Sequence, residues 1–213
     1  MDDGEKPDNE AYMTPWWVIR RLREVWRPPL GIAVEPAVGE YAIVKSLSDF
    51  SPRISKWITC DIREVYPLAW VGSAPRVPIQ HTRCDYTKTS LPVSDASLVI
   101  TNPPFSLAES FIRKARFECP KAELVFLLRL GFLASADRAD LWNEIGEPNL
   151  WVLPNRPSYT TSKPGTLKTD KYDYGWFIWP PFSHTTSAPG DGFKRCGSLG
   201  HLKLTSLEER KLG

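Results

Sequence analysis

Val99-Ile100-Thr101-Asn102-Pro103-Pro104-Phe105 is the end of an apolar run that stops at a pair of prolines. The run over residues 96–100 is typical of a buried strand. Each proline fixes φ near about −65° and lacks an N–H group, and the residue before a proline is pushed away from helical angles. The strand therefore ends in a stiff, extended corner. A helix is expected over residues 106–117, where apolar side chains recur near helical spacing, at Leu107, Phe111, Ile112 and Ala115.

This corner suits a reaction at the exocyclic amino group of a nucleobase, which is a poor nucleophile because its lone pair is delocalised into the ring. The amide oxygen of Asn102 and the carbonyl oxygen of Pro103 are candidate acceptors for the two amino hydrogens, and the Pro103-Pro104 backbone holds them rigidly. Phe105 offers a face on which a planar base can stack, worth about 1–3 kcal/mol per base. The alternative is an ordinary turn, capped by Asn102, at the end of a strand.

Earlier in the chain, residues 31–47 have the pattern of a strand, a tight turn and a helix, the first unit of a doubly wound α/β fold. The turn is Glu35-Pro36-Ala37-Val38-Gly39-Glu40, and its glycine allows a ligand to approach the backbone closely. Carboxylates at both ends of the turn disfavour the pyrophosphate of a dinucleotide, and the G-x-G-x-x-G pattern is absent. The same carboxylates favour a cation, such as the sulfonium or amino group of S-adenosylmethionine.

Two further acidic residues follow expected strand ends. A strand over residues 55–61 ends at Asp61, and an acidic residue at this place commonly holds ribose hydroxyls; the alternative is a helix cap. Asp85 is a candidate acceptor for an adenine amino group and Tyr86 a candidate cover for the ring, with an Asx-turn as the alternative. Residues 62–80 are expected to form a surface loop or an embellished helix.

Both flanks of this region have recognisable elements. Thr14 is a candidate N-cap and Pro15 suits the first position of a helix that runs to about Trp26, before Pro28-Pro29. A helix is also expected over residues 137–145. Three further strands are expected, over residues 122–128, 150–153 and 174–179.

The segment 154–173 is polar and too long for a simple hairpin turn. Basic residues interleaved with an aromatic residue suit a nucleic-acid backbone and an exposed base, and a solvated mobile loop is the alternative. The basic residues are Arg156, Lys163, Lys168 and Lys171, the acidic ones are Asp170 and Asp173, and the aromatic one is Tyr159.

Composition limits the class of protein. The chain has 213 residues, 42% of them hydrophobic, which is enough for one α/β domain. No run approaches the ~20 apolar residues that span a bilayer. The four cysteines form no C-x-x-C pair, and with three scattered histidines they predict free thiols in a reducing cytosol and no metal.

Charge is distributed unevenly along the chain. Five acidic residues and one lysine give residues 1–10 a charge of −4, which leaves +6 on the rest of a chain whose net charge is +2. The acidic N-terminus is expected to be disordered. A moderately basic body is compatible with a polyanionic partner.

Together these motifs resemble the DNA N6-adenine methyltransferases, in particular their small phage-type members, over about residues 12–180. The T-P helix start, the E-P-x-x-G turn, the strand-end aspartate, the C-D-Y segment and N-P-P-F occur in the family's order and spacing. The resemblance implies a Rossmann-like, doubly wound methyltransferase sheet of about seven strands with a final antiparallel hairpin. It places the catalytic domain over residues 11–182 and a C-terminal extension over residues 183–213.

The resemblance also implies the reaction and its participants. S-adenosylmethionine would donate a methyl group to the N6 amino group of adenine in double-stranded DNA, with no metal and no membrane, and the protein would act as a monomer or homodimer in the cytoplasm of a bacterial or phage-infected cell. The cofactor would contact Thr14, Pro15, Glu35, Pro36, Ala37, Gly39, Asp61, Ile62, Asp85, Tyr86 and Asn102. The catalytic residues around the flipped adenine would be Asn102, Pro103, Pro104 and Phe105. The DNA would contact Phe105, Arg129, Arg156, Tyr159, Lys163 and Lys168, with Tyr159 as a second stacking aromatic.

The chain departs from the family in two places. Tyr41 stands where members often have a second glycine, and the 32 residues after Pro181 leave no room for a separate target-recognition domain. A short or degenerate target, read by residues 154–173 with help from 62–80, is therefore expected. Three alternatives share the turn or the fold: an RNA adenine methyltransferase, a protein glutamine methyltransferase, and a non-enzymatic DNA-binding module. Cytosine N4 methylation is a further alternative, although its enzymes more often have Ser where Asn102 stands.

Overall fold

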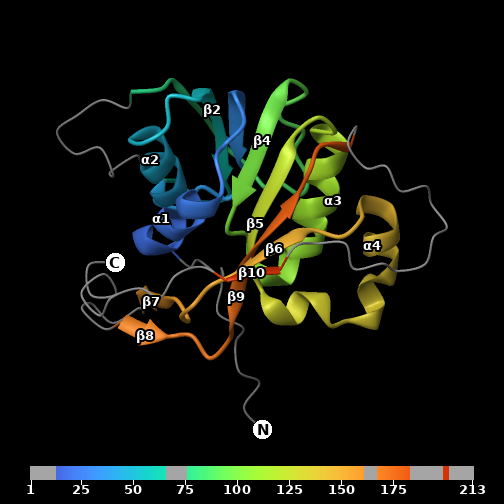
Figure 1. Cartoon of the computed structure of the whole chain (residues 1–213). Helices are drawn as coiled ribbons and strands as arrows, with labels where there is room; N and C mark the ends of the chain where they lie inside the picture. Colours follow the sequence, from blue (N-terminus) through green and yellow to red (C-terminus); the bar gives the residue numbers. More distant parts are fainter. Residues whose placement is uncertain (1–12, 66–75, 161–166, 183–198, 202–213) are drawn as a thin grey trace, which may run out of the picture.

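The computed structural model describes residues 13–65, 76–160, 167–182 and 199–201. Among these residues, eight strands form one sheet in the order β10-β6-β9-β5-β4-β1-β2-β3 (Figure 1). Their bounds are β1 (Gly31–Glu35), β2 (Ile54–Asp61), β3 (Ile79–Arg83), β4 (Ala96–Thr101), β5 (Glu123–Arg129), β6 (Asn149–Val152), β9 (Tyr174–Trp179) and β10 (Leu199–His201).

The direction of the strands confirms the doubly wound α/β fold. Strands β1 to β5 are mutually parallel, whereas β9 runs antiparallel to both β5 and β6. The pair β6 and β9 is the expected final antiparallel pair, and β10 adds a parallel strand beyond β6. From β1 the chain passes outward through β2 and β3 and then returns to β4 on the other side of β1. This reversal makes a topological switch point between β1 and β4.

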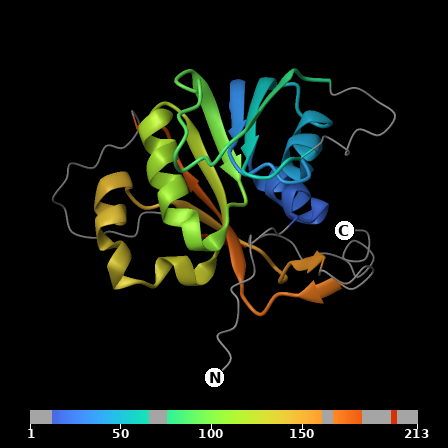
Figure 2. The same cartoon turned by 180° about the vertical axis from the view of Figure 1, so that it is seen from behind.

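Helices cover both faces of the sheet (Figures 1 and 2). The helices α1 (Trp16–Val25) and α2 (Ala42–Ser48) lie on one face, and α3 (Ala108–Glu118) and α4 (Ala139–Ile145) lie on the other. No helix of the described residues is long and apolar enough to cross a membrane.

Each face of the sheet has its own buried cluster, because successive side chains of a strand point to opposite faces. Ala33 of β1 and Leu98 of β4 pack with α1 and α2. Val34 of β1 and Val99 of β4 pack with α3 and α4. Strands covered on both sides therefore carry continuous apolar runs, as the sequence predicted for β4 and β5.

The start of α1 corrects one expectation. The helix begins at Trp16, and Pro15 occupies the cap position with no side-chain hydrogen bond to the helix. The prediction that Thr14 caps this helix is wrong, because its hydroxyl oxygen accepts a hydrogen bond from Asn102. After the prolines, a 3₁₀ turn, η2 (Phe105–Leu107), precedes α3, so the α-helix starts two residues later than predicted.

Strand β3 was not predicted, because residues 79–80 were placed in an irregular segment and only Ile79 is apolar among its five residues. It pairs in parallel with β2, from Trp57↔Ile79 to Asp61↔Arg83. As an edge strand it is only partly buried, so its hydrophobic signal is weak.

The polar segment 154–173 contains a small antiparallel hairpin, β7 (Ser158–Thr160) and β8 (Leu167–Thr169). Figure 1 shows this hairpin beyond the end of the sheet at which β4 and β5 terminate. Between β5 and α4 the chain forms the short 3₁₀ turns η3 (Leu130–Leu133) and η4 (Ala136–Arg138). The expected disordered N-terminus, most of the C-terminal extension and Lys163 lie outside the described residues.

Candidate functional site

The two stretches that the sequence singled out lie side by side. Strands β1 and β4 are parallel neighbours, with Ala33 opposite Leu98 and Val34 opposite Val99. The turn after β1, residues 36–41, and the N-P-P-F corner after β4 therefore leave the sheet at the same edge. Ligands of open α/β sheets bind outside the carboxyl ends of the strands at such a switch point.

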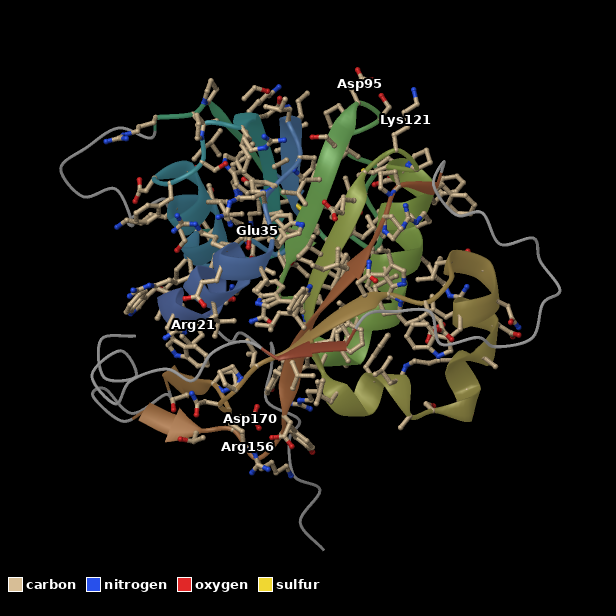
Figure 3. All side chains as sticks on the ribbon, viewed as in Figure 1. Arg21, Glu35, Asp95, Lys121, Arg156 and Asp170 are labelled. Carbon is tan, nitrogen blue, oxygen red and sulfur yellow. The ribbon has the colours of Figure 1, made fainter. Side chains whose placement is uncertain are left out.

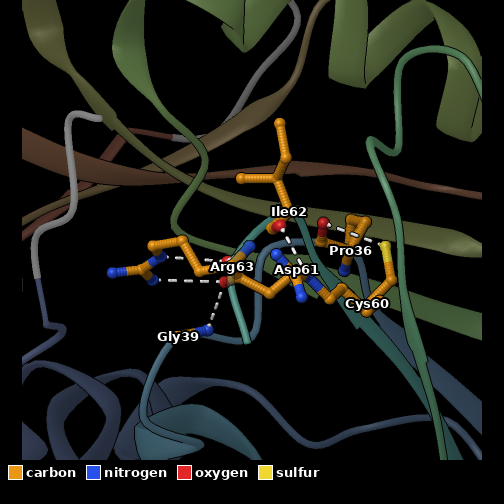
Figure 4. Close-up of polar contacts among 7 residues, drawn as sticks. Pro36, Gly39, Cys60, Asp61, Ile62 and Arg63 are labelled. Atoms are coloured by element: carbon orange, nitrogen blue, oxygen red, sulfur yellow. Dashed lines mark hydrogen bonds and ion pairs between the residues drawn. The ribbon is translucent and has the colours of Figure 1, made fainter. Parts of the chain in front are cut away.

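The turn after β1 is tied to the end of β2 (Figure 4). The backbone N–H of Gly39 donates to Asp61 Oδ2 at 2.9 Å, and the N–H of Val38 donates to the carbonyl of Cys60 at 3.0 Å. The Cys60 thiol lies 3.3 Å from the carbonyl oxygen of Pro36. Gly39 has a φ of +50°, a left-handed conformation that glycine adopts without steric cost.

Asp61 is fully engaged by the protein itself, which the sequence did not predict. The Arg63 side chain donates from Nε to Asp61 Oδ1 at 3.0 Å and from Nη2 to Oδ2 at 3.2 Å, and its backbone N–H also donates to Oδ1. Burial alone would raise the pKa of Asp61, but these bonds and that of Gly39 lower it below its ordinary value. A ribose that binds here has to share Asp61 with the guanidinium of Arg63. The only sequence signal was the spacing of two residues between Asp61 and Arg63.

Glu35 is buried at the end of β1, with 2% of its surface exposed. Within the described part of the chain, its Oε2 atom has no hydrogen-bond partner, while the backbone N–H of Val44 supports the carboxylate. Burial, with a contribution from the charge of Asp61, raises the pKa of Glu35 well above its ordinary value. Glu35 therefore binds a proton more readily than an exposed glutamate does. A buried oxygen with no partner marks a place where a donor group of a ligand gains a hydrogen bond.

Tyr41 occupies the position where the resemblance leads one to expect a glycine. Its backbone is left-handed, with φ 63° and ψ 22°, and its side chain is 1% exposed. A left-handed conformation costs a residue with a Cβ atom roughly 1–2 kcal/mol. The Tyr41 ring is packed in this conformation, with its centroid 5.9 Å from the centroid of the His81 ring. Backbone strain of this kind clusters at ligand-binding turns.

The N-P-P-F corner is anchored to α1. The Asn102 amide donates from Nδ2 to Thr14 Oγ1 at 3.1 Å, across 88 positions of sequence. This bond directs the amide oxygen away from Thr14. The N–H of Leu107 closes the turn on the carbonyl of Pro104 at 2.9 Å. The structure thus brings together Thr14 and Asn102, which the resemblance placed in one site.

Phe105 lies at the far side of this corner, against residues that the sequence did not connect with it. Its ring centroid is 5.4 Å from that of Tyr174, and the guanidinium carbon of Arg129 lies 4.1 Å from the Phe105 ring. The same guanidinium lies 4.0 Å from the ring of Tyr172. These side chains border a cavity of about 410 Å³, lined by Phe105, Ala108, Leu128, Arg129, Leu130, Gly131, Phe132, Arg138, Lys171, Tyr172 and Asp173.

Asp85 and Tyr86 have local partners. Asp85 Oδ1 accepts from the N–H and the hydroxyl of Thr87, at 3.0 and 2.6 Å, so the Asx-turn alternative describes its conformation here. Tyr86 is 2% exposed and packs 5.1 Å from Phe111 in the core. Ile62, by contrast, is 55% exposed immediately after Asp61 and offers an apolar surface at the strand end.

The basic residues of the segment 154–173 are only partly described. Arg156 forms an exposed ion pair with Asp173 at 2.8 Å, so the positive charge of Arg156 is offset. Figure 3 shows Arg156 and Asp170 below the sheet. Tyr159 lies on β7 and Lys168 on β8, and the positions of their side chains lie outside the described part. Instead, Asp170 and Tyr172, which precede β9, and Tyr174, its first residue, approach Phe105 or Arg129.

Among the described residues, no group of three or more histidine, cysteine, aspartate or glutamate side chains could hold a metal ion. Cys60, Cys84 and Cys119 are free cysteines.

No protein-family model matches the sequence, and no curated protein matches it. Solved structures do match. A dimethyladenosine transferase from Plasmodium falciparum shares 16% identity at a TM-score of 0.56, over 81% of this chain and 63% of that chain. A putative RNA methyltransferase from Pyrococcus horikoshii shares 12% identity at a TM-score of 0.57, over 83% and 91% of the two chains. A modification subunit of a putative type I restriction enzyme from Vibrio vulnificus shares 13% identity at a TM-score of 0.55, over 84% and 46%.

The chain has a methyltransferase fold. It spans about 63% of the length of the P. falciparum enzyme. At these identities the likeness describes the path of the backbone, so the roles of individual side chains rest on the geometry described above.

Proposed function

We propose that this chain transfers a methyl group from S-adenosylmethionine to the N6 amino group of an adenine that has been extruded from DNA. The observation that carries the proposal is the adjacency of the turn after β1 and the N-P-P-F corner after β4 at the switch point of the sheet. One turn offers carboxylates and a glycine, and the other offers acceptors for an amino group. Two of the three solved neighbours are named as an RNA methyltransferase and a restriction-modification subunit, which fits a nucleic-acid substrate.

On the cofactor side, four residues fit S-adenosylmethionine. The Oε2 atom of Glu35 can accept from a cationic amino group, and Gly39 leaves room for close approach. Asp61 can bind ribose hydroxyls alongside Arg63, and the exposed Ile62 can pack against the adenine ring of the cofactor. When bound, the cofactor supplies an electrophilic methyl group on a sulfonium.

On the substrate side, Asn102 and Pro103 position the amino nitrogen. Their oxygens accept its two hydrogens, so that the lone pair points out of the plane of the base toward the methyl group. With the cofactor held at Glu35, Gly39 and Asp61, the nitrogen would take the methyl group as the carbon–sulfur bond breaks, and it would then release one proton to water. Phe105 and Tyr172 are the aromatic rings placed to stack on the base, Tyr172 in the role that the resemblance suggested for Tyr159. Catalysis arises from position and from hydrogen bonds that strengthen as charge develops.

Labelled S-adenosylmethionine, offered with DNA, RNA or protein, tests the proposal. The expected product is N6-methyladenine in DNA, identified by mass spectrometry of the digested nucleosides. The Asn102→Ala variant is expected to lose at least about 100-fold in turnover, the scale of a lost transition-state hydrogen bond. Its affinity for S-adenosylhomocysteine should stay within about twofold in calorimetry. Absence of S-adenosylhomocysteine binding by the wild-type chain would refute the proposal.

RNA is the second candidate substrate. The specific observation in its favour is the likeness to the putative RNA methyltransferase of P. horikoshii, 91% of which is covered.

In the DNA case, the hairpin β7–β8 and the neighbouring segment are the elements available to read a target, and a site of no more than about five base pairs is proposed. Mapping of methylated adenines on treated plasmid distinguishes this from a longer, unique site.

A further inference from the structure

The guanidinium of Arg129 lies where the proposed function places the ring of the base. Arg129 is the last residue of β5, and its guanidinium carbon is 4.1 Å from the Phe105 ring and 4.0 Å from the Tyr172 ring. A planar, delocalised cation stacks on aromatic faces much as a base does. Arg129 thus covers an aromatic surface that the base would use.

A second set of contacts holds Arg129 in this position. Its Nε donates to the hydroxyl oxygen of Tyr174 at 3.2 Å, and Tyr174 in turn donates to Asp170. Nη2 of Arg129 lies 3.8 Å from Asp170. Asp170 and Tyr172 lie between β8 and β9, and Tyr174 is the first residue of β9, so one continuous segment holds the arginine through charge, stacking and a hydrogen bond.

The adjoining cavity offers a second position for the guanidinium. Arg129 lines the cavity of about 410 Å³ together with Arg138 and Lys171. The positive charge of Arg138 is partly offset, because its Nε lies 4.0 Å from Glu109 Oε2. The cavity is also lined by Asp173, whose carboxylate is paired with Arg156. The two further cations therefore favour an anion, and a phosphate forms bidentate hydrogen bonds with arginine. A phosphate next to the target nucleotide is therefore a suitable new partner for Arg129.

We infer that Arg129 is a specificity-determining residue that makes the site accept a base only as part of a polynucleotide. The inference rests on the proposed function. A polynucleotide exchanges the contacts of Arg129 with Phe105, Tyr172 and Asp170 for a contact with phosphate, and the base takes the vacated aromatic surface. A free nucleoside has no phosphate to offer and must displace the arginine without replacing its contacts.

Two substitutions distinguish the contribution of the planar guanidinium group from that of its positive charge. Arg129→Ala removes both, whereas Arg129→Lys keeps the charge but not the planar group. For each variant, kcat/KM is measured for an adenine-containing oligonucleotide and for free deoxyadenosine. The ratio of the oligonucleotide value to the deoxyadenosine value is expected to fall by about five- to thirtyfold in Arg129→Ala, because the substitution removes two cation–aromatic contacts that deoxyadenosine otherwise has to displace. Arg129→Lys should resemble Arg129→Ala with deoxyadenosine while it retains most of the affinity for the oligonucleotide.

Base stacking is also measured without methyl transfer. Stacking quenches the fluorescence of 2-aminopurine riboside, and we expect a lower Kd for this probe in both Arg129 variants than in the wild-type chain. Arg23→Ala is the matched control, because the Arg23 guanidinium, in the last turn of α1, lies 4.0 Å from the Phe50 ring and makes the same kind of contact with a ring outside the proposed site. It should change neither the ratio nor the Kd. Thermal unfolding of each variant verifies that it is folded.

The outcomes distinguish this inference from the proposed function. A wild-type chain that methylates the oligonucleotide, with a ratio that the Arg129 variants leave unchanged, contradicts the inference alone. A wild-type chain that methylates no nucleic acid contradicts the proposed function and the inference together. A lower ratio in both Arg129 variants, with tighter binding of 2-aminopurine riboside and no change in Arg23→Ala, supports the inference.

Discussion

At the scale of single residues, the environment of a side chain decides what chemistry it can perform. Glu35 and Asp61 are both acidic residues at strand ends, yet burial raises the pKa of Glu35 while Arg63 lowers that of Asp61. The sequence suggested two equivalent anions, Glu35 and Glu40, around the first turn. The structure shows one buried carboxyl group and one exposed one. Burial depends on contacts between residues far apart in the chain. The local sequence around the turn therefore could not predict that Glu35 is buried and Glu40 exposed.

Glu35→Gln is expected to stabilise the protein at pH 8. The pKa of Glu35 is raised on folding, so the folded chain binds the proton more tightly than the unfolded chain. The stability that this group contributes is present at low pH and is lost as the pH rises through the raised pKa. Glutamine has no proton to lose, so the melting temperature of the variant should exceed that of the wild-type chain at pH 8, and the difference should diminish near pH 4.

Glu40→Gln is the control for this experiment, because Glu40 is exposed on the same turn. Thermal melts of the three proteins between pH 4 and pH 8 provide the measurement. Equal melting temperatures of the wild-type chain and Glu35→Gln at pH 8 would show that burial does not perturb this carboxyl group.

At the scale of elements, strong local patterns were sufficient for most of the fold. Apolar runs predicted β4, β5 and β9, and the proline pair predicted where β4 ends. The edge strand β3 was missed because a partly exposed strand carries little hydrophobic pattern, and the hairpin β7–β8 was missed because each of its strands has only three residues. Contacts between elements were also out of reach. The resemblance placed Thr14 and Asn102 in one site, but no sequence pattern predicts the hydrogen bond between them or the contacts of Arg129 with Phe105 and Tyr172.

The contact between α1 and the N-P-P-F corner leads to a test at this scale. Thr14→Val removes the acceptor for Asn102 Nδ2 and retains a similar volume. We expect a loss of about 0.5–1.5 kcal/mol in the free energy of unfolding, as for one hydrogen bond, and at least about a tenfold loss of turnover. Urea unfolding and steady-state kinetics measure the two effects.

Ser97→Ala is the matched control, because the Ser97 hydroxyl also makes one bond from β4, to the carbonyl of Ile32 at 3.1 Å. Ser97 lies near the start of the strand, far from the corner. The control should lose a similar amount of stability and keep its turnover. Equal turnover in Thr14→Val and Ser97→Ala would mean that α1 does not position Asn102.

At the scale of the whole molecule, the order of the strands creates the site. After β1 the chain forms β2 and β3 on one side of that strand and then β4 on the other side. The turn at residues 36–41 and the corner at residues 102–105, which begin 66 positions apart in the sequence, therefore meet at one edge of the sheet. Figure 3 shows Asp95 and Lys121, before β4 and β5, at the opposite edge. The family resemblance predicted this arrangement, and the parallel pairing of β1 and β4 confirms it.

A crystal structure of the chain with S-adenosylhomocysteine tests most directly whether these two turns form one site. We predict that the ligand lies along residues 36–41, with its ribose at Asp61 and its sulfur atom facing the amide oxygen of Asn102. A ligand bound elsewhere on the chain, or bound with its sulfur directed away from Asn102, would contradict the account.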